Sequence, residues 1–193
     1  MFSDEKTVQN FCSGRIWVRR PRGQGWNERY VVRMDRTKRF KVNLRGYISI
    51  YGCGLVDIEG MHTGQSYLKI LEDIKIDEIA DSKQNKIFMQ DNAPIHKAKI
   101  VKEYFRKEEV DVLSWPPYSP DLNPIENVCA EMQKLVYKYM RLGVRIRKKE
   151  DLLNLCKRCF YQVCQAERIE KLNSSMSKRL CEVIRLNGKH TKY

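Results

Sequence analysis

Two short acidic blocks limit what this chain can fold into more than any other feature of its sequence. The first, Gln90 to His96, follows the apolar run 86–89, which predicts a buried strand ending at Asp91. The second, Trp115 to Asn127, places Glu126 in the first turn of a helix. The 34 residues between Asp91 and Glu126 are enough for one helix and one more strand. Two carboxylates brought from different elements to one sheet edge are what a Mg²⁺ phosphoryl-transfer site requires.

The proline-rich segment 115–124 separates the predicted strand from the predicted helix. Its prolines lack the backbone donor that a ladder or a helix needs, so regular structure is excluded there. Asn123 suits the N-cap position and Pro124 the first helical position. The apolar residues that follow at helical spacing form one face. They are Ile125, Val128, Cys129, Met132, Leu135, Val136 and Tyr139.

The pattern along the rest of the chain predicts an α/β fold. Strands are expected at 1–8, 40–44, 47–51, 55–58 after a Gly-Cys-Gly turn, 86–90 and 110–115. Helices are expected at 66–79, 96–106 and from 124 onward, with two more between 150 and 187 that stop at Gly188. An antiparallel start followed by right-handed crossovers suits a mixed sheet with helices on both faces.

Composition narrows the class of protein further. The length of 193 residues suits one domain, and 42% hydrophobic residues argue against disorder. No apolar run approaches the length of a membrane span. Seven cysteines, an odd number, fit a reducing compartment better than a disulfide framework.

The net charge of +13 is concentrated in two segments. Segment 15–45 holds eleven Lys and Arg against two acidic residues, and segment 138–158 holds eight against two. Such segments point to a polyanion such as a phosphate backbone, although a solvated basic surface explains a basic patch equally well. The residues expected to contact DNA are Arg15, Arg19, Arg20, Arg22, Arg145, Arg147, Lys148 and Lys149.

Each candidate carboxylate also has a purely structural interpretation. Asp91 could form an Asx-turn at the strand end. Glu126, three residues after Asn123, occupies the capping-box position. Asp4 could be an exposed terminal residue, while Glu5 should point to the opposite strand face and not share the site.

Cys156 and Cys159 resemble half of a zinc site. No second pair of ligands accompanies them in the sequence, and they lie one helical turn apart among apolar residues. Core packing is therefore the preferred interpretation.

Both acidic blocks resemble the second and third catalytic motifs of mariner-superfamily cut-and-paste DNA transposases. Residues 2–7 resemble the first motif of that family, and residues 176–188 resemble its C-terminal ending. The string Trp-Pro-Pro-Tyr-Ser-Pro-Asp-Leu-Asn-Pro-Ile-Glu is the most specific part of the likeness.

The resemblance implies an RNase H-like fold, with a mixed five-stranded sheet flanked by helices. It also implies a catalytic triad of Asp4, Asp91 and Glu126 that holds two Mg²⁺ ions, or Mn²⁺ in their place, with Asp4 bridging the two ions. Asn92, His96 and Asn123 would support the triad, His96 by a hydrogen bond to DNA or to Asp91. The implied activity is DNA cleavage and strand transfer in the nucleus on transposon ends and target DNA. A homodimer would be compatible with this activity, whereas a membrane and a small-molecule substrate are not expected.

Departures from the family pattern keep a second interpretation open. Cys129 stands where relatives usually have Trp, and Tyr51-Gly52 stands where they usually have Trp-Gly. The helix-turn-helix region of the family is missing ahead of Asp4, so the expected organisation is one catalytic domain, 1–193, with a helical extension at 141–193. The second interpretation is a truncated or co-opted relic that binds nucleic acid or protein without turnover.

Overall fold

The first sheet of the molecule is a three-stranded antiparallel arrangement. The computed structural model describes residues 1–11, 18–30, 38–61, 63–74 and 86–193. In it β1 (Phe2–Gln9) pairs with β2 (Lys41–Ser49), which pairs with β3 (Gly52–Asp57). In this register Asp4 lies opposite Gly46.

A second, parallel pair of strands continues from the edge of β1. It consists of β4 (Lys86–Phe88) and β5 (Val110–Val112). One parallel bridge between Phe2 and Met89 joins the two sheets. The connection from β4 to β5 contains a 3₁₀ turn, Pro94–Lys97, and the helix α3 (Lys99–Lys107).

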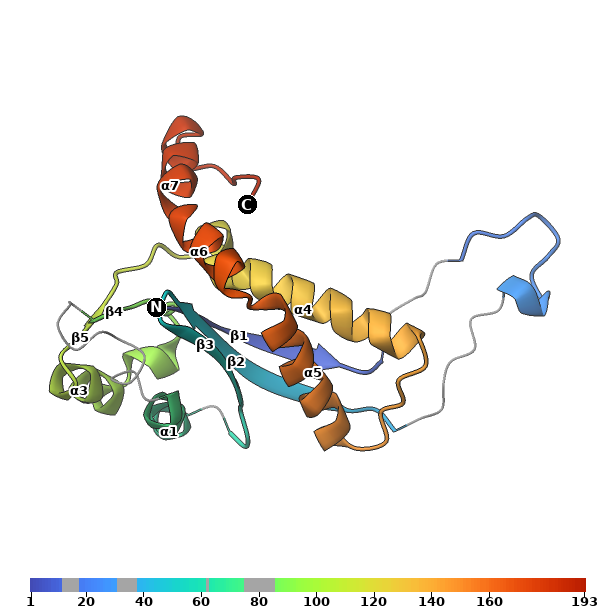
Figure 1. Cartoon of the computed structure of the whole chain (residues 1–193), viewed down its shortest axis with the longest axis horizontal. Coiled ribbons are helices and arrows are strands. Elements are labelled where there is room, and N and C mark those ends of the chain that lie inside the picture. Colours follow the sequence, from blue (N-terminus) through green and yellow to red (C-terminus); the bar gives the residue numbers. More distant parts are fainter. Residues whose placement is uncertain (12–17, 31–37, 62, 75–85) are drawn as a thin grey trace.

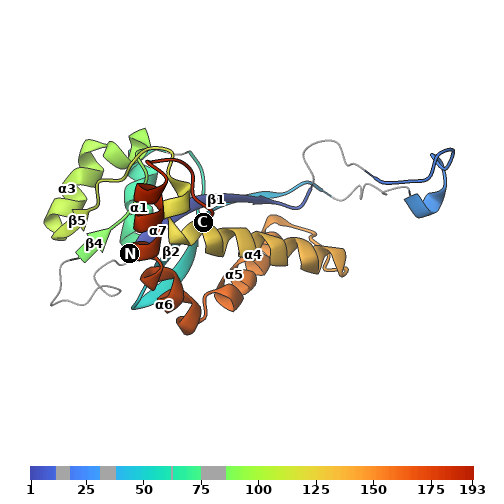
Figure 2. The same ribbon diagram turned by 90° about the horizontal axis from the view of Figure 1, so that it is seen from above.

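Helices cover both faces of the strands, as the sequence predicted. On one face α4 (Pro124–Arg141) and α5 (Lys149–Val163) pack against β1, β2 and β3, while α1 (Gly64–Ile74) lies with α3 on the other face (Figures 1 and 2). Each face has its own hydrophobic core. The described part of the chain contains no helix long and apolar enough to cross a membrane.

Two details of the first sheet differ from the prediction. The strands expected at 40–44 and 47–51 form one continuous strand, and the turn after it lies at Ile50 and Tyr51 instead of at the glycines. Gly46 lies in the middle of this strand, where a Cβ atom would come within 3.3 Å of the Phe160 ring and 3.5 Å of Ile125. The glycine is therefore a packing requirement and does not mark a break in the strand.

The remaining elements follow the prediction with shifted boundaries. The strand expected at 110–115 ends at Val112, and the helix expected from residue 96 begins with the 3₁₀ turn. The helix expected at 66–79 is confirmed as far as Ile74, because residues 75–79 lie outside the described part. The proline-rich segment contains only a short 3₁₀ turn, Pro120–Leu122.

The C-terminal region forms three helices where two were expected. After α5 come α6 (Ala166–Ser174) and α7 (Met176–Arg185), and Gly188 follows the end of α7 with a φ of 77°. Cys156 and Cys159 of α5 are fully buried in the larger core, so core packing was the right interpretation.

Arg179 of α7 ties this C-terminal region to the loop that precedes Glu126. Its side chain is 2% exposed and donates to the Asp121 carbonyl at 2.5 Å and to the Asn127 side chain at 2.6 Å. The Nε atom donates to the Ser175 hydroxyl at 2.9 Å. One guanidinium thus holds the 3₁₀ turn, the first turn of α4 and the start of α7 together.

We expect the substitution Arg179→Gln to lower the free energy of unfolding by about 1–3 kcal/mol, because it leaves buried acceptors without a donor. The neighbouring Lys178 is exposed on the same helix, so Lys178→Gln serves as the matched control and should change stability by less than about 0.5 kcal/mol. Urea denaturation measures both values. Equal effects of the two substitutions would show that Arg179 does not carry this junction.

Candidate functional site

Asp4 and Glu126 come from different elements and meet at the start of α4. Asp4 is half-buried in β1, and its carboxyl group shares a hydrogen bond with that of Glu126. A hydrogen bond between two carboxyl groups requires that one of them carry a proton. The ammonium group of Lys6 lies 3.6 Å from Glu126 Oε2 and offsets part of the negative charge.

Burial and the neighbouring Glu126 raise the pKa of Asp4 from its ordinary value of 3.8 to about 7. The proton in this pair occupies a position that a cation could take, and carboxylate oxygens are the ligands that Mg²⁺ and Mn²⁺ prefer. Asn123 beside the pair has a buried Oδ1 atom with no hydrogen-bond partner in the described structure. The donors at this point therefore fit a divalent cation.

Glu126 does not act as the helix cap that its position allowed. The N-cap residue Asn123 makes no capping side-chain bond, and its amide instead donates to the Ser3 carbonyl at 3.4 Å. The contacts of the Glu126 carboxyl group go to Asp4 and Lys6.

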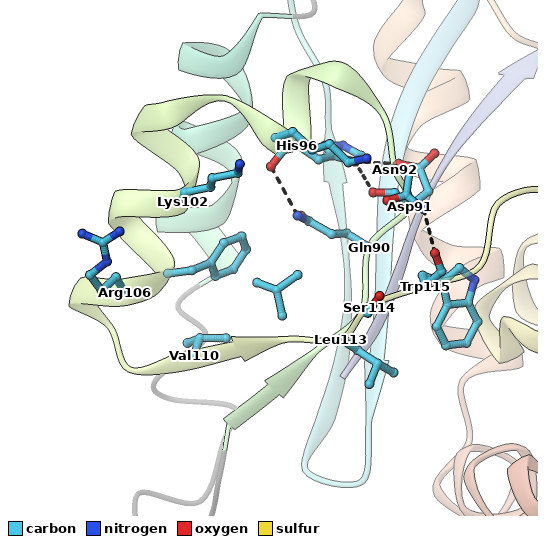
Figure 3. Close-up of a pocket in the computed structure, with 13 residues that line it drawn as sticks. Gln90, Asp91, Asn92, His96, Lys102, Arg106, Val110, Leu113, Ser114 and Trp115 are labelled. Atoms are coloured by element: carbon cyan, nitrogen blue, oxygen red, sulfur yellow. Dashed lines mark hydrogen bonds and ion pairs between the residues drawn. The ribbon is translucent and has the colours of Figure 1, made fainter.

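Asp91 follows β4 and is held by His96 (Figure 3). Its Oδ1 atom lies 2.6 Å from His96 Nδ1 and accepts a hydrogen bond from the Ala93 amide at 3.0 Å. The second contact is the Asx-turn that was one interpretation of this residue. The side chain of Asp91 is 61% exposed and that of His96 only 3%.

The three predicted carboxylates do not all converge. The structure brings Asp4 and Glu126 together, whereas Asp91 is engaged by His96. Within the described ranges no group of three or more His, Cys, Asp or Glu side chains is arranged to hold a metal ion. Of the supporting residues, Asn123 lies by Asp4, and Asn92 donates to the Trp115 carbonyl at 2.7 Å.

Arg45 contacts residues beside Asp4 and also His96, the residue that holds Asp91. It is fully buried, and its guanidinium donates to the Ser3 hydroxyl at 2.8 Å and to Glu5 at 3.0 Å, with His96 Nε2 at 3.2 Å. Glu5 in turn lies 3.4 Å from His96 Nε2. Glu5 thus contacts Arg45 and His96, whereas its neighbour Asp4 contacts Glu126, as the alternation of side chains along a strand predicts.

An aromatic residue completes this buried polar cluster. The Tyr67 ring lies 4.3 Å from the His96 ring and 4.5 Å from the Arg45 guanidinium. The Tyr67 hydroxyl donates to Gln90 Oε1 at 2.5 Å. Sequence reasoning missed Arg45 and Tyr67, because each stands alone in an otherwise ordinary strand or helix pattern.

The residues predicted to contact DNA lie far from the carboxylates. Arg19, Arg20 and Arg22 are exposed in segment 18–30, which extends away from the body beyond the ends of β1 and β2 (Figure 1). The group Arg145, Arg147 and Lys148 is exposed after the C-terminal end of α4. Glu126 lies in the first turn of this helix, so about 22 Å of helix separates it from the last residue, Arg141. Lys149 is bound to Asp57 at 3.2 Å, and Arg15 lies outside the described residues.

Basic residues nearer to Asp91 were missed. Lys97, Lys102 and Arg106 line a pocket of about 370 Å³ that Asp91 and His96 also line (Figure 3). Their spacing in the sequence could have identified Lys102 and Arg106, because they lie one turn apart on the helix predicted directly after Asp91.

Comparison with known proteins gives the family. The model of the family described as DDE superfamily endonuclease matches residues 2–152. The chain is 30% identical over 203 residues to the Tcb2 transposase of Caenorhabditis briggsae and 30% identical over 197 residues to the Tc1 transposase of Caenorhabditis elegans. Each alignment covers 100% of this chain and 70% of the relative.

Solved structures give the fold. The Mos1 strand transfer complex matches with a TM-score of 0.68 at 20% identity over 98% of this chain, which spans 55% of the Mos1 chain there. The catalytic domain of Mos1 mariner transposase matches with a TM-score of 0.60 at 20% identity, over 79% of this chain and 77% of that domain. The mixed α/β, RNase H-like character expected from sequence is confirmed.

The proton shared by Asp4 and Glu126 predicts a pH dependence of stability in the absence of metal. The folded chain keeps a proton on Asp4 up to a pKa of about 7, whereas the unfolded chain releases it near 3.8. The stability contributed by this proton is therefore present below pH 3.8 and lost as pH rises through about 7.

Thermal melting in EDTA across this pH range tests the prediction. The melting temperature of the wild type should fall relative to that of Asp4→Asn, which keeps the shape of the side chain and does not titrate. Saturating Mn²⁺ should reduce the fall, because a cation then takes the place of the proton. Parallel curves for wild type and variant would contradict the shared proton.

Loss of Arg45 should disturb both parts of the site. We expect Arg45→Met to lower the free energy of unfolding by about 1–3 kcal/mol, because Ser3, Glu5 and His96 lose a buried donor. The NMR signals of the His96 ring should also shift or broaden. Lys41→Met, an exposed substitution in the same strand, is the control and should leave both measurements near wild type.

Proposed function

The chain belongs to the DDE superfamily of endonucleases and, by its relatives, to the Tc1/mariner transposases, and on this premise we propose that it performs their DNA chemistry. In this proposal the chain cleaves DNA with a divalent metal and joins the cut end to new DNA. The single observation that carries the proposal is the carboxyl pair of Asp4 and Glu126, whose shared proton marks a place for a cation.

Asp4, Glu126 and Asp91 are the residues that would hold Mg²⁺ or Mn²⁺. Both metals occur with Mos1 in its solved structures. A divalent cation bound there supplies Lewis-acid stabilisation of charge at the scissile phosphate and lowers the pKa of water. The chain itself supplies the acidic oxygens and, beside Glu126, the ammonium group of Lys6.

Asp91 has to leave the Oδ1 contact with His96, or share it, to act with the other two carboxylates. Its exposed position allows this movement, because in the described structure its side chain contacts only the Ala93 amide and His96. Contacts with Arg45, Glu5 and Tyr67 hold the His96 ring in place. His96 therefore binds Asp91 in a fixed position.

The two sheets would then act as one five-stranded sheet in the order β3-β2-β1-β4-β5. Support comes from the bridge at Met89 and from the Ser3 hydroxyl, which donates to the Met89 carbonyl at 2.8 Å. We propose that residues 1–193 form one catalytic domain, with 141–193 as its helical extension, and that the protein acts in the nucleus.

DNA is the proposed partner. Mos1 has been solved as a paired-end complex with the left transposon end, and a similar substrate is proposed for this chain. The exposed basic groups at Arg19 and Arg145 would hold the phosphate backbone without reading its sequence. A homodimer stays a prediction. The second interpretation, a non-catalytic relic, receives no support, since the relatives matched over the whole chain are transposases.

Nicking of supercoiled plasmid in Mn²⁺ or Mg²⁺ tests the proposal. We expect Asp4→Asn, Asp91→Asn and Glu126→Gln each to reduce the rate by at least about a hundredfold, because each removes part of the stabilisation of the transition state. The exposed acidic residues Asp73 and Glu170 provide the controls Asp73→Asn and Glu170→Gln, which should nick at the wild-type rate.

Circular dichroism should show that every variant in this set is folded. EDTA should abolish nicking by the wild type. A variant that is folded and nicks normally would remove that carboxylate from the site, and no metal-dependent nicking by the wild type would refute the proposed function.

A further inference from the structure

A pocket beside Asp91 has a basic side, an apolar floor and an opening at the candidate site. Its volume is about 370 Å³. Figure 3 shows Lys102 and Arg106 of α3 along one side, Leu113, Ser114 and Trp115 along the other, and Asp91 and His96 at one end.

Lys102 and Arg106 differ from the other basic residues of α3. Lys99 lies 3.8 Å from Glu103, and Lys107 lies 3.8 Å from Glu108, so these two cations are paired with acidic residues. Neither Lys102 nor Arg106 has a carboxylate within 4 Å in the part of the chain that the structure describes. The helix therefore directs its uncompensated positive charge to the pocket, where a phosphate would neutralise it.

The floor of the pocket is apolar. Phe105 and Val110 are 4% and 7% exposed and belong to the smaller core, while Val112, which also lines the pocket, is 41% exposed. A flat heterocycle placed on such a surface removes apolar area from water on both partners. Trp115 at the edge adds a second aromatic surface of the kind that unpaired bases contact.

The volume of the pocket determines whether it can hold a base pair or a single nucleotide. The volume lies at the small end of pockets that hold small molecules, so it admits one nucleotide and excludes a duplex. Because Asp91 lines the same pocket, a nucleotide inside it would be adjacent to the phosphate at the carboxylates. A nucleotide still paired in a helix could not enter.

Resting on the proposed DNA cleavage, we propose that this pocket binds one unpaired nucleotide of the DNA strand that flanks the scissile phosphate. The base lies against Val112 and Trp115, and a backbone phosphate contacts Lys102 and Arg106. The site would favour DNA whose end is frayed or distorted over regular duplex.

Fluorescence anisotropy with three short DNA probes, in EDTA so that no cleavage occurs, tests this inference. The probes are a blunt duplex, the same duplex with one unpaired 5′-phosphorylated nucleotide, and that overhang with its base removed. Wild type should bind the overhang roughly fivefold to tenfold more tightly than the blunt and abasic probes, as expected for one base contact.

Two double variants on α3 provide a matched comparison. Lys102→Gln with Arg106→Gln should lose most of the preference for the overhang, whereas Lys99→Gln with Lys107→Gln removes the same charge and should keep it. An equal loss of the preference in both double variants would refute the proposed binding in the pocket, because general electrostatic attraction would then explain the result. Equal binding of abasic and intact overhangs would overturn the base contact.

The outcome is independent of the cleavage assay. If the wild type fails to nick but prefers the overhang, the proposed function fails and the pocket stands. If the wild type nicks but shows no preference, the pocket proposal fails alone.

Discussion

The buried guanidinium of Arg45 is the interaction on which the arrangement of the site depends. It lies on β2 and contacts the residues on both sides of Asp4, namely Ser3 and Glu5, and also His96, which holds Asp91. A charge in the core is tolerated where its hydrogen-bond donors are used. The Nη1 and Nη2 atoms of Arg45 have such partners, whereas its Nε atom has none in the described structure. The position of this charge therefore fixes the register of β1 against β2 and the placement of the loop after β4 at the same time.

The contacts of Arg45 also determine which carboxyl groups have a cationic partner. Glu5 pairs with Arg45 and Asp91 contacts His96, whereas Asp4 and Glu126 face each other on the other side of β1, with Lys6 beside Glu126. Two carboxylates in that position repel, so the pair retains a proton and the pKa of Asp4 rises to about 7. The chain thus keeps one acidic pair that retains a proton, while the third carboxylate, Asp91, is held by His96.

Sequence patterns predicted the elements well and their contacts poorly. The apolar run before Asp91 and the Asn-Pro start of α4 are local signals, so β4 and α4 were found. The strand 41–49 was predicted as two strands, because the glycine at its centre, Gly46, is required by the Phe160 ring, which is more than a hundred residues away. The triad was named from family resemblance, but the attachment of Asp91 to His96 and the role of Arg45 depend on tertiary contacts that no local pattern encodes.

The distribution of positive charge argues for two separate tasks in DNA binding. The exposed groups at segment 18–30 and after α4 lie at the end of the molecule away from Glu126, so in the proposed function the phosphates that they contact would not be the ones that are cut. Close to the carboxylates lie Lys6 at Glu126 and, near Asp91, Lys97, Lys102 and Arg106. A larger positive field there would compete with a metal ion for the carboxylates. The remote groups can therefore supply affinity, while the few local cations position the phosphate without displacing the metal.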